Sequence, residues 1–200
     1  LSSLEEDGLY KGSPSVKALI DSTALLNRMT GIDKQIVKAN TDTEDVRVLV
    51  PPYDMSANIS PTFCEVSRAI DLGKANRIML KGGRGSTKSS YAYQKILDVF
   101  LHRPHAQWIC GRRYANTLRR SCFANVLWAI AKRGMTVGKP GEGCDFDKTT
   151  SPMEITFNKT GQKILFYGLD EPEKLKSITF EDPKAKIELL LLEEYNQLAC

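Results

Sequence analysis

The chain has 200 residues, of which 42% are hydrophobic and 26% charged, and these values suit one globular domain of ordinary size. Its net charge of +4 permits a polyanionic partner without requiring one. The odd number of five cysteines, without a C-x-x-C pair, argues against a disulfide framework and favours an intracellular protein, and no apolar run is long enough to predict a membrane span.

The first 45 residues predict an N-terminal extension that is distinct from the main domain. Apolar residues after Ser13 and Pro14 recur at helical spacing and predict one helix that ends near Gly31. The polar segment 38–45 is typical of a linker. We therefore divide the chain into an extension at 1–45 and a main domain at 46–200. Because the chain begins with Leu1, we expect it to be a piece of a longer protein.

The segment at 77–101 has the order of a phosphate-binding P-loop. An apolar run at 78–80 predicts a strand, the glycine-rich stretch 82–85 a tight turn, and Lys88 the start of a helix. Backbone N–H groups around such a turn surround an anion, and the helix N-terminus adds a partial positive charge. Thr87 stands where the motif has a glycine, so it must take the loop's geometry without glycine's freedom. Taken alone, the segment also permits a simple glycine-rich turn.

The chemistry expected at this loop is the binding of ATP with Mg²⁺. We expect Lys88 to reach the β- and γ-phosphates and the Ser89 hydroxyl to take one Mg²⁺ position. Phe63, in a helix expected at 59–70, is predicted to lie near the adenine base, although an aromatic residue at helical spacing is also typical of a core. The loop residues expected to bind nucleotide are Gly82, Gly83, Arg84, Gly85, Ser86, Thr87, Lys88, Ser89 and Ser90.

Arg84 is unusual because a phosphate loop requires small residues and one lysine. Its guanidinium either points to solvent, where it can pair with a carboxylate, or stabilises the transferring γ-phosphoryl group as an arginine finger in cis. We count Arg84 with Lys88 among the predicted catalytic residues.

Beyond the loop, the pattern predicts a further strand, a helix and a hairpin. The strand is expected at 106–113, and the helix at 117–133 with Asn116 as its N-cap. Two more strands, at 153–157 and 162–168, are separated by a segment typical of a hairpin turn.

The last segment predicts a Walker B motif. An apolar run at 189–192 suits a parallel strand buried on both faces, and Glu193 and Glu194 follow it directly. The carboxyl ends of strands in open α/β sheets are where ligands bind. We expect Glu193 to hold Mg²⁺ through its water shell and Glu194 to activate the attacking water. A helix start after a core strand is the alternative interpretation.

Together these motifs resemble the large terminase subunit of tailed bacteriophages, especially of the type found in phages and prophages of Gram-positive bacteria. The resemblance covers about residues 59–198 and includes a P-loop ending in Ser-Thr-Lys-Ser. The blocks that carry it are Lys81 to Ser90, Gly111 to Ile130, Phe166 to Ile178 and Leu189 to Leu198.

The resemblance implies an α/β fold, namely a P-loop NTPase of the additional-strand, catalytic-glutamate type with a mainly parallel sheet flanked by helices. It implies an ATPase motor that moves double-stranded viral DNA into a procapsid in the host cytoplasm. The implied partners are viral DNA, the portal protein, a small terminase subunit and further copies in a ring, with no membrane. In the family a coupling motif and a nuclease follow Walker B, so we expect no nuclease activity from these 200 residues.

Other functions remain open at this point. The Walker motifs alone also fit a helicase or another P-loop DNA translocase, and a nucleotide-binding fragment without turnover is possible. A GTPase-type switch is disfavoured, because the nearest match to its N-K-x-D motif, at 158–161, lacks the aspartate.

Overall fold

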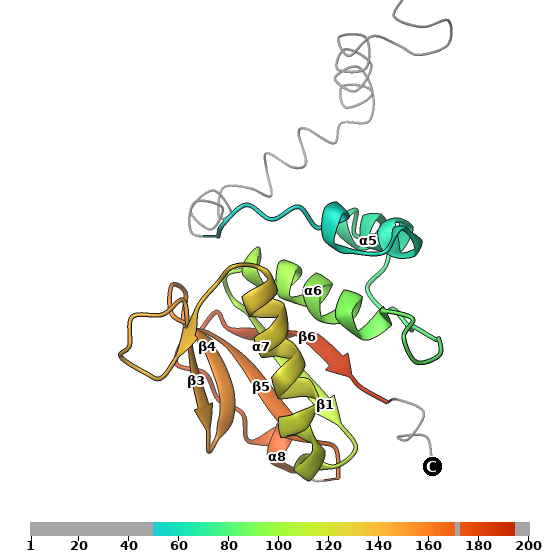
Figure 1. Cartoon of the computed structure of the whole chain (residues 1–200). Coiled ribbons are helices and arrows are strands. Elements are labelled where there is room, and N and C mark those ends of the chain that lie inside the picture. The colour runs from blue at the N-terminus through green and yellow to red at the C-terminus, as the bar shows by residue number, and fades with distance from the viewer. Residues whose placement is uncertain (1–49, 171–172, 195–200) are drawn as a thin grey trace, which may run out of the picture. The chain divides into compact units, whose positions relative to one another are not determined.

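The computed structural model describes residues 50–170 and 173–194, which form a mixed α/β domain (Figure 1). Its centre is a six-stranded sheet in the order β2-β3-β4-β5-β1-β6. The extension predicted at 1–45, with its helix and linker, lies outside the described residues. Within the described ranges, no helix has the length and apolar character needed to cross a bilayer.

The helical elements comprise short 3-10 helices and α-helices. They are η1 (Ser56–Asn58), η2 (Pro61–Phe63), α5 (Cys64–Asp71), α6 (Lys88–Leu101), η3 (Ala115–Arg120), α7 (Cys122–Lys132) and α8 (Glu173–Lys176). The strands are β1 (Ala106–Arg112), β2 (Val137–Gly138), β3 (Phe146–Thr150), β4 (Met153–Phe157), β5 (Gln162–Gly168) and β6 (Lys186–Leu192).

The sheet is mostly parallel, as expected. Strand β1 pairs in parallel with β5 on one side and with β6 on the other, and β2 is parallel to β3. The hairpin predicted around residues 158–161 is confirmed, because β4 and β5 are antiparallel neighbours. The structure therefore has strands where the sequence predicts them: β4 and β5 in the hairpin, and β1 in the segment 106–113.

The strand predicted at 78–80 is wrong, because residues 77–83 carry neither helix nor strand. The segment pairs with none of the six strands of the sheet, and its side chains Ile78 and Met79 are 43% and 77% exposed. The expectation that β6 is buried on both faces is also wrong: β6 is an edge strand here, and its Leu190 is 59% exposed. An apolar run indicates a preference for buried positions, but a strand forms only where a neighbouring strand pairs with it, and it is buried on both faces only where other elements cover both faces.

The helix predicted at 117–133 is divided in two, and Asn116 lies inside η3 instead of capping α7. The break falls at Ser121, whose φ of −114° and ψ of −92° are not helical. The Ser121 hydroxyl donates to the Thr117 carbonyl at 2.9 Å, a local bond of the kind that competes with a regular helix. Leu118 and Cys122 are both buried, so the apolar spacing continues through the break and could not reveal it.

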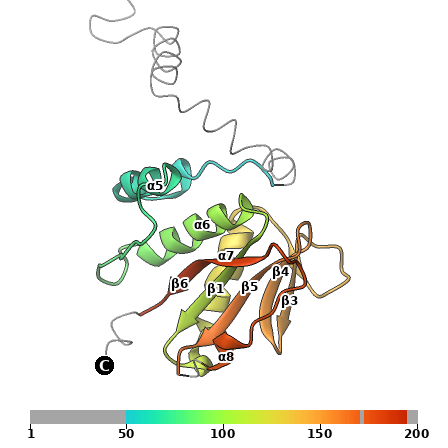
Figure 2. The same ribbon diagram turned by 180° about the vertical axis from the view of Figure 1, so that it is seen from behind.

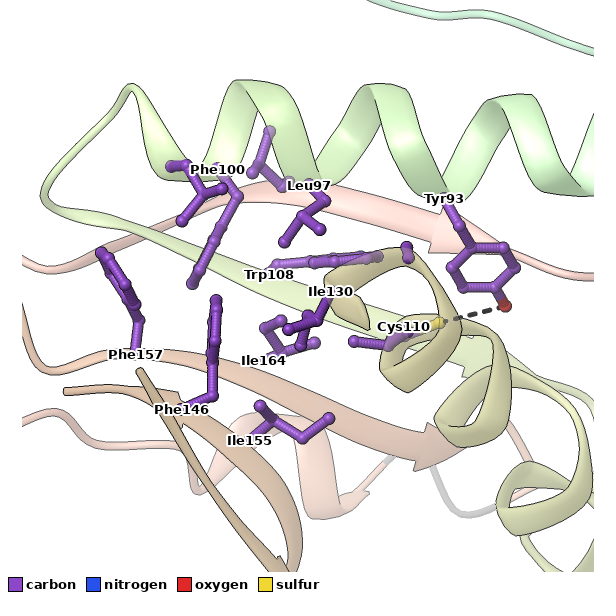
Figure 3. Packing of buried hydrophobic residues seen from close by; sticks show 14 of the residues in the cluster. Tyr93, Leu97, Phe100, Trp108, Cys110, Ile130, Phe146, Ile155, Phe157 and Ile164 are labelled. Atoms are coloured by element: carbon purple, nitrogen blue, oxygen red, sulfur yellow. Dashed lines mark hydrogen bonds between the residues drawn. The ribbon is translucent and has the colours of Figure 1, made fainter. Parts of the chain in front are cut away.

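The core lies between the sheet and the helices α6 and α7 (Figure 3). The indole of Trp108 on β1 is fully buried, with the rings of Tyr93 and Phe100 from α6 at centroid distances of 6.3 and 6.2 Å. Ile164 on β5 and Ile130 on α7 belong to the same cluster. This packing fixes α6, and with it the loop that opens α6, against the centre of the sheet.

Gln162, at the start of β5, joins the sheet to the turn between α6 and β1. Its side chain is fully buried, and its Nε2 lies 3.0, 2.7 and 3.0 Å from the carbonyl oxygens of Phe100, Arg103 and Ala106. Its Oε1 accepts a hydrogen bond from the Thr160 hydroxyl at 2.7 Å. The two N–H groups of this amide can donate to two of these carbonyl oxygens at a time, so Gln162 links β5 to the turn between α6 and β1.

We expect Gln162→Leu to lower the free energy of unfolding by about 3 kcal/mol, because buried carbonyl groups lose their donor. Gln162→Glu should be at least as damaging, since a carboxylate would face carbonyl oxygens. Urea denaturation followed by far-UV circular dichroism measures both effects. A Gln162→Leu protein as stable as the parent chain would show that these hydrogen bonds contribute little.

Candidate functional site

The predicted P-loop lies between α5 and α6 and ends in a left-handed residue. Gly85 has a φ of 77°, and Thr87, which takes the place of the motif's glycine, has a φ of 55° and a ψ of 7°. The Thr87 carbonyl accepts the backbone N–H of Tyr91 at 2.9 Å, so Thr87 is the N-cap of α6. The expectation that Thr87 takes a glycine-like geometry is confirmed.

This conformation costs free energy at Thr87. A left-handed backbone brings Cβ close to the following carbonyl oxygen, which costs about 1–2 kcal/mol for an L-residue and is rarer still for a β-branched one. The rest of the loop therefore imposes the conformation on Thr87. Lys88 is folded back over the loop, where its Nζ donates to the Gly83 carbonyl at 3.0 Å. That bond joins the two ends of the turn that is expected to surround phosphate.

A cavity of about 290 Å³ opens beside the loop. Lys88 and Ser86 line it together with Phe63 from η2. The Phe63 ring stacks on Tyr91 at a centroid distance of 4.4 Å and an interplanar angle of 3°, so one of its faces is already covered. The structure thus brings Phe63 and Lys88 to the same cavity, which we call the lysine cavity.

Glu193 and Glu194 follow β6 and lie against β1 and α7. The Glu193 backbone N–H donates to the Gly111 carbonyl at 2.9 Å, continuing the ladder between β6 and β1 by one residue. Asn125 Nδ2, on α7, lies 3.1 Å from Glu193 Oε1, and Cys122 Sγ lies 3.6 Å from Glu193 Oε2. Each oxygen of the Glu193 carboxylate therefore has a donor on α7.

Glu194 is held by an arginine of β1. Arg112 Nη2 lies 2.6 Å from Glu194 Oε2, and Arg112 Nη1 lies 3.9 Å from Glu193 Oε2. Burial would lower the pKa of the Arg112 guanidinium, but the hydrogen bond and the charge of Glu194 outweigh it and raise that pKa. Glu194 has a φ of 52°, a second left-handed residue that is not glycine.

The thiols behind Glu193 form a small buried group. Burial raises the pKa of Cys110 on β1 well above its usual value. A hydrogen bond with Cys110 lowers the pKa of Cys122. Cys122 is the first residue of α7 and contacts Glu193. The Tyr93 hydroxyl lies 3.6 Å from Cys110 Sγ, and burial raises the pKa of Tyr93 as well.

The loop and the glutamates lie on the same side of the domain. The start of α6 and the C-terminal end of β6 are at the same side of the sheet in both views (Figure 1 and Figure 2). The remaining loop residues named in the sequence, Gly82, Gly83, Arg84, Gly85, Ser86 and Ser89, are exposed, and Ser90 is half-buried.

A metal ion at this site would depend on few protein ligands. The described residues contain no group of three or more His, Cys, Asp or Glu that could hold one. Mg²⁺ usually binds through one or two protein groups together with waters and substrate phosphates. Oxygen donors such as the Ser89 hydroxyl and the Glu193 carboxylate fit that chemistry, and their roles stay a prediction.

The contacts of Arg112, Cys122 and Asn125 were missed in the sequence. Cys122 was assigned to the buried face of a helix, which is correct, but its contact with Glu193 spans 71 positions of the chain. The signal available for Asn125 was chemical: it is the one uncharged amide among the apolar residues of α7, three positions after Cys122. Such a residue on a buried face requires a polar partner.

Comparisons with known proteins agree on one family. A family model described as phage terminase large subunit matches residues 74–200. The terminase large subunit of Bacillus phage SPP1 is 32% identical over 124 residues, which cover 62% of this chain and 28% of that relative. The PBSX phage terminase large subunit of Bacillus subtilis (strain 168) is 30% identical over 119 residues, which cover 60% of this chain and 24% of the relative. The chain therefore spans about a quarter of the length of these curated relatives.

The resemblance stated from the motifs is confirmed, including its Gram-positive type, because both relatives belong to a Bacillus phage or to Bacillus subtilis. The match begins at residue 74 and therefore contains the glycine-rich loop, Arg112 and both glutamates.

The contact between Arg112 and Glu194 should appear as a coupling free energy. We expect a double-mutant cycle of Arg112→Ala and Glu194→Ala to give about 0.5–1 kcal/mol in urea unfolding, a value reduced by solvent because the Glu194 side chain is 42% exposed. The pair of Lys176 and Glu173, whose side chains are 74% and 78% exposed, provides a matched control with weaker coupling. Equal coupling in the two pairs would mean that partial burial adds nothing to the Arg112–Glu194 contact.

Proposed function

The chain belongs to the phage terminase large-subunit family, and we propose that it is an ATP hydrolase that drives double-stranded viral DNA into a procapsid. The observation that carries the proposal is the position of Glu193 and Glu194 at the end of β6, on the side of the sheet where the glycine-rich loop opens α6. Phosphate-binding groups and acidic groups at one edge of a parallel sheet are what phosphoryl transfer from a nucleotide requires.

The residues divide the work of hydrolysis among them. The loop backbone and Lys88 hold the phosphates, with Lys88 turning from the Gly83 carbonyl to the terminal phosphates. Ser89 and Glu193 would hold Mg²⁺, which neutralises charge on the phosphates when it is bound. Asn125 and Cys122 keep the Glu193 carboxylate in one orientation. Glu194 accepts the proton of the attacking water and is 42% exposed, so water can reach it.

Arg84 stabilises the negative charge that develops on the γ-phosphoryl group during transfer. It lies in the exposed part of the loop, four residues before Lys88, so its guanidinium is free of the core packing that holds α6. A planar guanidinium offers two parallel hydrogen bonds to phosphate oxygens, which an ammonium group does not.

The wider assignment rests on the family. We propose that the chain acts in the host cytoplasm during virion assembly, in a ring of copies docked on the portal protein, with a small terminase subunit as a further partner. These partners are those of a whole terminase large subunit, and the chain matches about a quarter of the length of its curated relatives.

A second candidate function is nucleotide binding without turnover. The observation that favours it is the 2.6 Å contact of Arg112 with Glu194, because Glu194 Oε2 is then occupied by the guanidinium instead of by the attacking water. ATP binding and phosphate release, measured on the chain with and without double-stranded DNA, separate the two functions. An ATP complex that releases no phosphate in either condition would support the second candidate.

Two substitutions separate binding from chemistry. Lys88→Ala should abolish ATP binding, because the terminal phosphates lose their fixed cation. Glu194→Gln should keep ATP affinity and lower the hydrolysis rate by about 10²- to 10⁴-fold, the usual contribution of a general base. Isothermal titration gives the affinity and phosphate release gives the rate.

Matched controls for these variants lie elsewhere on the surface. Lys139→Ala and Glu173→Gln remove the same charges at exposed positions outside the site, and should leave both quantities unchanged. Normal turnover in Glu194→Gln would remove Glu194 from the role of base.

Arg84→Ala should lower DNA-stimulated turnover by roughly 10³-fold while ATP affinity changes little, because an arginine finger acts on the transition state. Arg84→Lys should not restore the rate, since its point charge lacks the planar fork. Steady-state phosphate release at saturating ATP measures both variants. Parent-like turnover in Arg84→Ala would leave Arg84 as a surface residue.

A further inference from the structure

A second cavity lies beside the start of α6, and it shares no lining residue with the lysine cavity. It measures about 390 Å³, and we call it the tryptophan cavity, because Trp128 of α7 forms part of its wall. Thr87 and Ser90 line it from the start of α6, and residues 58–60 line it from the segment before η2. It is within the size range of small-molecule sites, which begins at about 300 Å³.

The direction of a bound nucleotide decides which cavity takes its base. The lysine of a P-loop reaches the β- and γ-phosphates, so the lysine cavity is at the terminal-phosphate end. The base must leave the loop on the side away from Lys88. The tryptophan cavity meets that condition, because it shares Thr87 and Ser90 with the loop and Lys88 does not line it.

Trp128 provides a surface on which a planar ring can stack. Its side chain is 42% exposed, although the neighbouring residues Val126 and Ala129 are buried. Within the described residues it makes no ring contact with another aromatic side chain, whereas Phe63 already stacks on Tyr91. An indole left open beside a cavity is suited to a nucleobase, since every base has a π-face.

Polar side chains line the same cavity as this ring. Gln94 is held at both ends of its amide, which accepts from the Tyr53 hydroxyl at 2.6 Å and donates to the Ser90 carbonyl at 3.1 Å. Asn58 Nδ2 donates to the Asp54 carbonyl at 2.8 Å, which leaves Asn58 Oδ1 to accept a hydrogen bond from a ligand. Lys132, one turn after Trp128 on α7, adds a positive charge at the rim.

We propose that the tryptophan cavity binds the base of the nucleotide, stacked on Trp128, while the loop holds the phosphates. This inference rests on the proposed ATP-binding function and adds a base subsite to it. The base then lies against α7, away from the predicted contact with Phe63. A purine amino group donating to Asn58 Oδ1 would give the subsite a preference for adenine.

The test compares a ligand that has a base with one that lacks it. Mg·ATP and inorganic triphosphate with Mg²⁺ are titrated into the chain and into Trp128→Ala. We expect Trp128→Ala to bind ATP about 5- to 150-fold more weakly, the range for losing one aromatic–base stack, and to bind triphosphate unchanged. Tyr114→Ala is the matched control, since it removes another half-exposed ring outside the cavity and should alter neither affinity.

Fluorescence gives a second measure that does not depend on affinity. The chain has two tryptophans, and Trp108 is fully buried in the core, so a ligand can contact only Trp128. ATP should quench emission in the parent chain and not in Trp128→Phe, and triphosphate should quench neither. A Trp128→Phe protein keeps a ring of similar shape and guards against loss of fold.

The other outcomes are equally decisive. Unchanged ATP affinity in Trp128→Ala, or a preference for ATP over triphosphate that disappears in Phe63→Ala instead, overturns the base subsite and leaves the proposed function intact. Quenching by ATP that depends on Trp128 but not on Lys88 would remove the proposed loop function and keep the subsite. Binding of neither ligand to the parent chain overturns both.

Discussion

The parallel pairing of β1 with β6 is the contact on which the candidate site depends. The last residues in register are Gly111 and Leu192, and the bond from the Glu193 N–H to the Gly111 carbonyl extends the ladder by one step. Arg112, at the end of β1, and the two glutamates that follow β6 therefore lie at the same end of neighbouring strands. Their side chains carry opposite charges. The same pairing buries Leu189 against Trp108 and the helices, so the packing of the core and the geometry of the acidic pair have one origin.

Two residues at the site have a backbone conformation that costs free energy. Thr87 and Glu194 both lie in the left-handed region, with φ of 55° and 52°, although neither is glycine. Each costs about 1–2 kcal/mol, and such residues persist only where the surroundings impose them. At Thr87 the loop and the first hydrogen bond of α6 do so together, and at Glu194 the ion pair with Arg112 contributes. Strain of this kind gathers where a protein handles ligands, which agrees with the proposed roles of both segments.

Helix α7 connects the two ends of the proposed nucleotide site. Asn125 contacts Glu193, and Trp128, three residues later, lines the cavity proposed for the base. Residues three apart on a helix are neighbours on its surface. Val126 and Ile130 anchor the same helix in the core, so α7 cannot shift at one contact without moving the other. One rigid helix therefore holds both the ring proposed to bind the base and the amide that orients Glu193.

Local patterns in the sequence determined the hairpin of β4 and β5, the strand β1, the glycine-rich loop at the start of α6 and the acidic pair after β6, because turn residues and apolar spacing act over a few positions. The motifs together also determined the family. Tertiary structure alone decided that residues 78–80 form no strand and that β6 stands at an edge. Tertiary structure also determined that Arg112 and Asn125 are the partners of the glutamates. These contacts join residues about 70 to 80 positions apart, so no local pattern of residue spacing predicts them.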